Sequence, residues 1–275
     1  MYQATQIMDN DQLMRVVPSV FATEPFRKVS ERYTFIPTIG IVDALRDEGF
    51  MPVHASQSLT QIDEKRGFTK HMLRFRREED MGSMKGKAVG TEVPELVLVN
   101  SHDRSSGYQL SAGLYRLVCS NGMTVKSSNF GDINVRHSGN IMEEVIQGSY
   151  RIIEEMPRIL EQVASFKSIQ LQPEHQLAFA TAALELRYPH DEANNSRAPI
   201  MPEQLLNVRR WDDKSNDLWT TFNRVQENFM KGGLKGIATT GRRTRTRKIG
   251  SVTEDLRLNK SLWLLTEKMA ELAVK

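Results

Sequence analysis

This sequence of 275 residues has only one cysteine, no long apolar run and no leader-like N-terminus. Cys119 is its one cysteine, so no disulfide can form within the chain, and a reducing, cytoplasmic setting is expected. No stretch approaches the roughly 20 apolar residues that span a bilayer. Residues 1–10 lack the basic region and apolar run of a signal peptide. We therefore expect a cytoplasmic protein with no membrane partner.

Common catalytic and cofactor-binding motifs are missing as well. None of the six histidines has the i, i+4 partner of a helical zinc site, and the chain has no CxxC pair. It also lacks a Walker A loop, a GxGxxG fingerprint and a GxSxG nucleophile elbow. The sequence therefore predicts no enzyme, no metal and no cofactor.

The polar segment 100–106 is the most enzyme-like part of the chain. Its His102-Asp103 pair has the chemistry of a metal ligand or a general base. Asn, Ser and Asp side chains also cap their own backbone in turns, and a turn is the preferred interpretation.

The residues that are present predict an α+β fold. Hydrophobic residues make up 39% of the chain and charged residues 26%, which suits a core under a solvated surface. A helical stretch over 11–21 is broken by Pro18. A short helix begins at Pro37-Thr38, with Thr38 as its N-cap, and ends at Gly49. An antiparallel meander of about five strands packed on helices should follow, over residues 50–59, 68–77, 96–100, 107–119 and 123–127.

Turn and helix signals organise the rest of the chain. Asn121-Gly122 predicts a two-residue type I′ turn between the last two strands, and residues 78–94 read as a long loop. Apolar residues recur at helical spacing over 141–163, where Pro157 kinks the helix or divides it in two. Later helices are expected from Pro173, over 218–229 with Ser215 as cap, and over 258–272 with Thr253 as cap. We place a domain boundary at residue 172, which gives an α+β core over 1–172 and a mainly helical region over 173–275.

Cations on one predicted strand suggest a binding surface. Strand alternation over 68–77 puts Lys70, Arg74 and Arg76 on one face and apolar residues on the other. Arg116 and Lys126 could extend that face across the hairpin. An ordinary solvated face is the alternative interpretation.

Residues 242–248 carry five positive charges in seven residues and no acid. Threonines in this run can bond phosphate oxygens, and the flanking glycines favour a flexible loop. Such a segment binds backbone phosphate without reading sequence. A solvated loop or a protein-binding tail remains the alternative. The candidate cations are Arg242, Arg243, Arg245, Arg247 and Lys248.

Four stretches of the chain carry a resemblance to a known family: residues 100–122, Arg136-His-Ser-Gly139, residues 216–228 and Leu256-Arg-Leu-Asn-Lys-Ser-Leu-Trp263. Together they resemble a phage, prophage and conjugative-plasmid family that carries a domain-of-unknown-function label. The resemblance covers nearly the whole chain and implies a mobile-element protein in a bacterial host cell.

The expected order of elements also resembles the core of single-strand annealing proteins of the Red beta and RecT type. This resemblance implies a homo-oligomer, a ring or a filament, that lays single-stranded DNA along a basic groove without catalysis. Stacking aromatics would then lie nearby. Tyr108 and Phe130 are candidates that suit the core equally, and Trp211, Trp219 and Trp263 are assigned to the helical half.

Two other classes of function stay open at this point. One is a metal-dependent nuclease that uses His102-Asp103. The other is a non-enzymatic host-interaction or anti-defence protein, which would bind a host protein and show no affinity for DNA.

Overall fold

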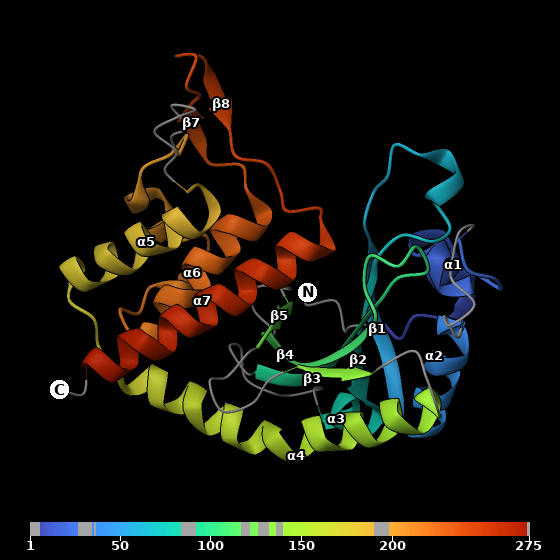
Figure 1. Cartoon of the computed structure of the whole chain (residues 1–275). Helices are drawn as coiled ribbons and strands as arrows, with labels where there is room; N and C mark the ends of the chain where they lie inside the picture. Colours follow the sequence, from blue (N-terminus) through green and yellow to red (C-terminus); the bar gives the residue numbers. More distant parts are fainter. Residues whose placement is uncertain are drawn as a thin grey trace. The chain divides into compact units, whose positions relative to one another are not determined.

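The structure, a computed structural model, describes residues 6–26, 35, 37–83, 92–116, 122–125, 132–135, 140–189 and 198–273 (Figure 1). The chain forms two compact units, Met1–Pro157 with Gly250–Thr253 and Arg158–Ile249 with Glu254–Lys275. Their boundary falls inside helix α4 (Ile141–Ser168), which continues through Pro157, so a division of this helix into two is wrong. Residue 172, our predicted boundary, lies within the second unit.

Unit 1 is built on an antiparallel sheet. Its strands follow the order β1-β2-β3-β4-β5, and β6 pairs with β4. This arrangement confirms the predicted α+β fold and its meander. The elements are α1 (Asn10–Val16), 3₁₀ helix η1 (Pro18–Phe21), α2 (Thr38–Asp47), β1 (Phe50–Gln57), 3₁₀ helix η2 (Asp63–Lys65), β2 (His71–Arg77), α3 (Glu78–Ser83), β3 (Glu92–Asn100), β4 (Tyr108–Arg116), β5 (Gly122–Thr124), β6 (Ile133–Val135) and the first part of α4.

One face of this sheet is apolar and packs on helices. Leu73, Leu98 and Leu110 lie opposite one another across β2, β3 and β4, and all three are wholly buried. Helix α4 approaches this face at Gly148, where an added Cβ would lie 2.8 Å from Leu110 Cδ1. Any side chain at this position would have to displace the end of the Leu110 side chain.

The hairpin turn was placed wrongly from the sequence. Strands β4 and β5 do pair antiparallel, but Gly122 lies within β5 opposite Tyr115, and Met123 lies opposite Leu114. A turn centred on Asn121-Gly122 would instead put Ser120 opposite Met123. Pairing of the wholly buried Met123 and Leu114 outweighs the local turn preference.

The segment expected as a long loop begins with a helix. Helix α3 has three acids in its first turn, Glu78, Glu79 and Asp80. Their negative charges stabilise the helix by interacting with the positive end of its dipole. Strand β3 already begins at Glu92, and residues 84–91 are outside the described ranges.

Unit 2 is mainly helical, as predicted. Helix α6 is its centre, because every residue from Leu218 to Met230 is buried. Trp219 stacks on Phe222 with ring centroids 5.2 Å apart, and Trp263 meets both rings edge-on. The elements are the second part of α4, α5 (Pro173–Arg187), 3₁₀ helices η3 (Pro202–Leu206) and η4 (Trp211–Asp213), α6 (Leu218–Lys231), β7 (Lys235–Ile237), β8 (Arg243–Arg245) and α7 (Val252–Ala273).

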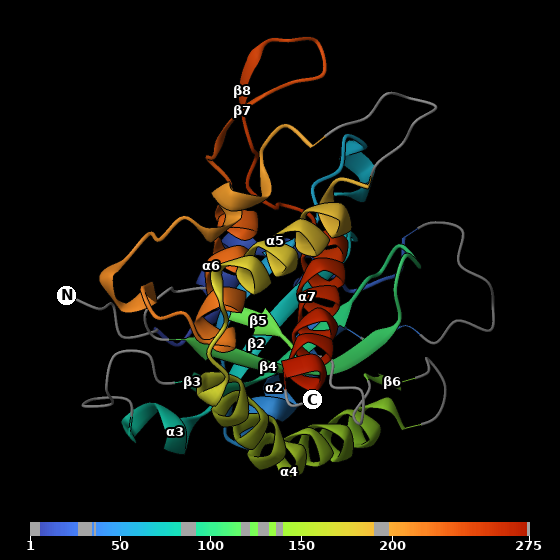
Figure 2. The same cartoon turned by 90° about the vertical axis from the view of Figure 1, so that its left-hand side faces the viewer.

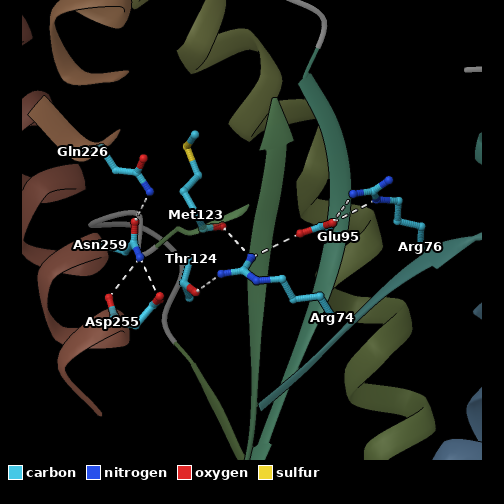
Figure 3. Close-up of polar contacts among 8 residues, drawn as sticks. All are labelled: Arg74, Arg76, Glu95, Met123, Thr124, Gln226, Asp255 and Asn259. Carbon is cyan, nitrogen blue, oxygen red and sulfur yellow. Dashed lines mark hydrogen bonds and ion pairs between the residues drawn. The ribbon is translucent and has the colours of Figure 1, made fainter. Parts of the chain in front are cut away.

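Polar side chains between α6 and α7 are also hydrogen-bonded inside unit 2. Gln226 Nε2 donates to Asn259 Oδ1 at 3.0 Å, and Asn259 Nδ2 donates to Asp255 Oδ1 at 2.9 Å (Figure 3). Asp217 caps the helix by accepting from Thr220 N, so the cap is not Ser215 as predicted.

Candidate nucleic-acid interface

The cation run of residues 242–248 forms one side of a two-stranded ribbon. Strand β8 pairs antiparallel with β7, with Arg243 opposite Ile237 and Arg245 opposite Lys235. Gly241 closes the turn with φ 78° and donates from its N–H to Ala238 O. The flexible loop that we predicted is therefore an ordered hairpin, which projects beyond the helices of unit 2 in both views (Figures 1 and 2).

The ribbon exposes its cations. Arg242, Arg243, Arg245, Arg247 and Lys248 are all exposed, and so is Lys235, which the sequence analysis did not single out. Arg245 and Lys235 lie directly opposite each other in the ribbon. Their like charges repel, which destabilises the pairing of the two strands. The whole segment 231–249 contains no Asp or Glu. An anion from outside this segment would relieve the repulsion.

Backbone contacts hold the base of the ribbon in place. Arg187 of α5 donates to Phe229 O and to Arg247 O, each at 2.6 Å. Gln204 Nε2 donates to Lys235 O at 2.8 Å. These side chains bind main-chain oxygens, so they fix the ribbon without neutralising its cations.

Two residues at the base of the ribbon have structural roles. Thr246 is buried, and its hydroxyl accepts a hydrogen bond from Leu234 N at 3.1 Å. The expected contact between this hydroxyl and a phosphate is therefore not available. Gly232 ends α6 with φ 60°, and a Cβ there would lie 2.6 Å from the main-chain carbon of Arg247. A side chain at Gly232 would push the cation strand away from α6.

The open cationic face expected on β2 is wrong. Arg74 and Arg76 do share one face of the sheet, but they are only 3% and 1% exposed. Both guanidinium groups bind Glu95 of β3, at 3.2 Å and 2.7 Å, and Arg74 also donates to Met123 O at 3.2 Å (Figure 3). The Arg76 guanidinium lies 3.9 Å from the ring centroid of Tyr115. Buried charge is stable only when paired, and Glu95 supplies the pairing.

The other cations proposed for that face do not extend it. Arg116 is buried and lies on the opposite face of the sheet from Arg74, because it pairs in register with Glu92. Lys70 is half-buried and donates to Thr253 Oγ1 at 3.2 Å. Thr253 was predicted to cap the last helix, but it lies inside α7, which begins at Val252. Lys126 lies outside the described residues, as do Cys119 and Phe130. The ribbon is therefore the candidate interface.

Comparison with known proteins places the chain in a family. The model named "Domain of unknown function (DUF932)" matches residues 25–263. The chain belongs to the DUF932 family. It is similar to the UPF0380 proteins YfjQ and YafZ of Escherichia coli (strain K12), each 42% identical over 262 residues that cover 95% of this chain and 91% of the relative. No solved structure matches it.

The DUF932 match contains both the ribbon and a buried polar cluster around Thr38. Thr38 Oγ1 lies 3.0 Å from Nε2 of His71 and of His102, and Asn100 Nδ2 donates to it at 3.1 Å. All four side chains are fully buried. Thr38 was predicted to cap α2, but its hydroxyl instead connects α2 to the sheet, and α2 has no side-chain cap.

Proton positions in this cluster follow from its partners. His71 Nδ1 faces Thr69 O at 2.9 Å, so it carries a proton. Desolvation by burial lowers the pKa of His71 to about 4, against opposing effects from the Thr69 hydrogen bond and the charge of Asp103. Nε2 of the neutral His71 therefore accepts a hydrogen bond from the Thr38 hydroxyl. His102 donates a hydrogen bond from its own Nε2 to the Thr38 oxygen. The Thr38 hydroxyl thus donates one hydrogen bond, to His71, and accepts two, from His102 and Asn100.

His102 and Asp103, the two residues of the nuclease interpretation, both have partners within the fold. His102 is wholly buried within the cluster, and Asp103 Oδ1 accepts from Ser105 N at 3.0 Å in a self-capped turn. Within the described ranges, no three His, Cys, Asp or Glu side chains could hold a metal ion together.

Among the helices of the described ranges, none is both long and apolar enough to cross a membrane.

The structure separates the three tryptophans that the sequence grouped together. Trp219 and Trp263 are buried in the aromatic cluster, but Trp211 is 78% exposed. Tyr108 is wholly buried and is therefore a core residue. The sequence held a signal for Trp211, since it stands in the polar segment Arg209-Arg-Trp-Asp-Asp-Lys214, outside every apolar stripe.

Proposed function

We propose that this DUF932 protein binds nucleic acid, single-stranded DNA in preference to duplex, through the phosphate backbone and without catalytic chemistry. The observation that carries the proposal is the ribbon, which holds six exposed cations on an anchored hairpin in a segment without acids. Such a group is surrounded by counterions that a polyanion displaces on binding.

Binding through the ribbon should be independent of sequence. Arg and Lys at these positions reach phosphate oxygens, and contacts of this kind position a protein without reading bases. Anchoring by Arg187 and Gln204 fixes the ribbon before binding, which reduces the entropy lost when a strand is captured.

Strand annealing by a homo-oligomer is the activity that we propose for the bound state. Its support is the resemblance of the element order in unit 1 to the core of annealing proteins. Annealing requires that bound strands keep their bases accessible, and contacts limited to phosphates are compatible with this.

The test is an anisotropy titration of a labelled 40-mer single strand and its duplex at several salt concentrations. The variant changes Arg242, Arg243, Arg245, Arg247 and Lys248 to Gln. For a single strand, the loss of five phosphate contacts should reduce the slope of log K against log salt by about 3.5. Between 50 and 200 mM salt, the binding constant of the variant should therefore fall by a factor about 100 times smaller than that of the wild-type protein.

A matched control separates a local contact from a change of net charge. Changing the exposed Arg15, Arg66, Arg151, Arg158 and Lys167 to Gln also removes five charges, and both variants go from +3 to −2 (+3 − 5 = −2). The control should keep the wild-type slope. An equal loss of slope in both variants, or no binding by the wild-type protein at low salt, would refute the proposal.

Annealing and assembly are measured on the same protein. We expect faster pairing of complementary labelled strands and large complexes in mass photometry when DNA is present. Tight binding without either result would limit the function to strand binding.

A further inference from the structure

Trp211 is unusual among the aromatic residues of unit 2. It is 78% exposed, whereas Trp219 and Trp263 are 1% and 0% exposed. Burying a large apolar side chain typically stabilises a fold, so this residue forgoes a contribution that the other two tryptophans make.

The segment around Trp211 is held firmly on α6. Arg209 Nε donates to Asn228 Oδ1 at 2.6 Å, and Arg210 forms ion pairs with Glu227 and Asp213. Glu227 and Asp213 are both buried and the Arg210 side chain is 21% exposed, so these pairs are partly shielded from solvent. Trp211 is thus an exposed ring on a fixed support, in the short helix η4.

A cation lies against the indole ring. Lys214 Nζ is 3.3 Å from the ring centroid, and Lys214 is itself exposed. With 78% of Trp211 open to solvent, the ring can still accept a flat partner while the ammonium meets a phosphate. An exposed aromatic beside cations is the arrangement used to bind single strands. Asp212 is an exposed acid in the same segment and partly offsets this charge.

Trp211 is connected to the ribbon through the C-terminal end of α6. Arg209 donates from its guanidinium to Gly232 O at 2.6 Å, and Gly233 N donates to Thr246 O at 2.8 Å. The support of the exposed ring and the base of the cation strand therefore meet at the same two glycines.

We infer that Trp211 stacks on a base of the single strand whose phosphates the ribbon holds. This inference rests on the proposed function and adds a base contact to it. Every base offers a flat π surface, so stacking adds affinity without adding a sequence requirement. It also accounts for a preference for single strands, because duplex bases are already stacked.

The experiment compares a 40-mer single strand with an abasic strand of the same length and charge. Wild-type protein should bind the base-containing strand about 5- to 150-fold more tightly, the range for one stacked base. Trp211→Ala should remove this difference and leave the salt slope unchanged, because no phosphate contact is lost. Trp211→Phe should restore most of it, and Met201→Ala, which truncates another exposed apolar residue of unit 2, should have no effect.

Intrinsic fluorescence gives a second readout. Two of the three tryptophans are buried, so quenching on addition of unlabelled strand reports mainly on Trp211. If the ribbon variant shows its reduced salt slope but Trp211→Ala keeps both the quenching and the preference over the abasic strand, the stacking inference is wrong and the proposed function stands. If the wild-type protein binds neither strand, both are wrong.

Discussion

Acid should destabilise unit 1 through His71. This histidine is fully buried, hydrogen-bonded to Thr69 O and Thr38, and has a pKa lowered from 6.5 to about 4 by desolvation. Between these values the unfolded chain binds a proton that folded His71 does not. Stability therefore rises with pH in this window: the contribution is complete above pH 6.5 and is lost as pH falls toward 4.

The size of the effect follows from the two pKa values. Between pH 7.5 and pH 4.5, the free energy of unfolding should fall by about 2.5 kcal/mol because of His71 alone, which is about a 70-fold change in the opening equilibrium. Protonated His71 would also direct an N–H at Thr38 Oγ1, which already accepts from Asn100 and His102.

Hydrogen exchange followed by mass spectrometry is the suitable assay, with exchange corrected for its intrinsic pH dependence. Peptides from β2 and β3 report on unit 1, and fluorescence of the three tryptophans, all within unit 2, provides an internal reference. His71→Gln should lower the free energy of opening at pH 7.5. Between pH 7.5 and pH 4.5, this free energy should then fall by about 2.5 kcal/mol less than in the wild-type protein. His175→Gln, on the exposed side of α5, should behave as wild type. An unchanged decline in His71→Gln would show that another group causes the acid sensitivity.

Two further predictions concern stability and the ribbon. Glu95→Gln leaves the buried Arg74 and Arg76 without their carboxylate and should cost about 3–5 kcal/mol in urea unfolding, whereas Glu79→Gln at the exposed pair with Arg77 should cost about 1 kcal/mol or less. Gly232→Ala combines a positive φ with a clash against Arg247 and should cost about 1–3 kcal/mol. It should also speed tryptic cleavage within 242–248, whereas Gly250→Ala, which has open space, should not. Equal effects of the paired variants would contradict both assignments.

Strand alternation and helix-start residues predicted the fold well, because both depend on interactions between residues that are close in sequence. Alternation in β2 correctly put Arg74 and Arg76 on one face of the sheet, and α5 begins at Pro173 as predicted. Exposure of that face was predicted wrongly, because Glu95 lies on another strand and only the β2–β3 register brings it to the arginines. Pairing between strands is not encoded within one strand.

The candidate site shows the same division between local and distant information. Composition identified the cations of residues 242–248, but their fixed hairpin depends on Arg187 and Gln204, which are far away in sequence. Thr38 fits an N-cap by its position, yet its partners His71 and His102 come from β2 and the turn after β3. A residue's role was mistaken wherever a distant side chain supplied its partner.

Arginine serves opposite purposes in the two units, and the difference lies in the available acids. Arg74 and Arg76 are buried and share one carboxylate, so their guanidinium groups are not presented to a partner. Segment 231–249 has no acid of its own, and the side chains that anchor the ribbon bind its main chain. Under the function that we propose, its cations take their counterions from solution. Release of those ions would supply the free energy for the polyanion binding that we propose, and this makes the salt slope of the ribbon variant the decisive measurement.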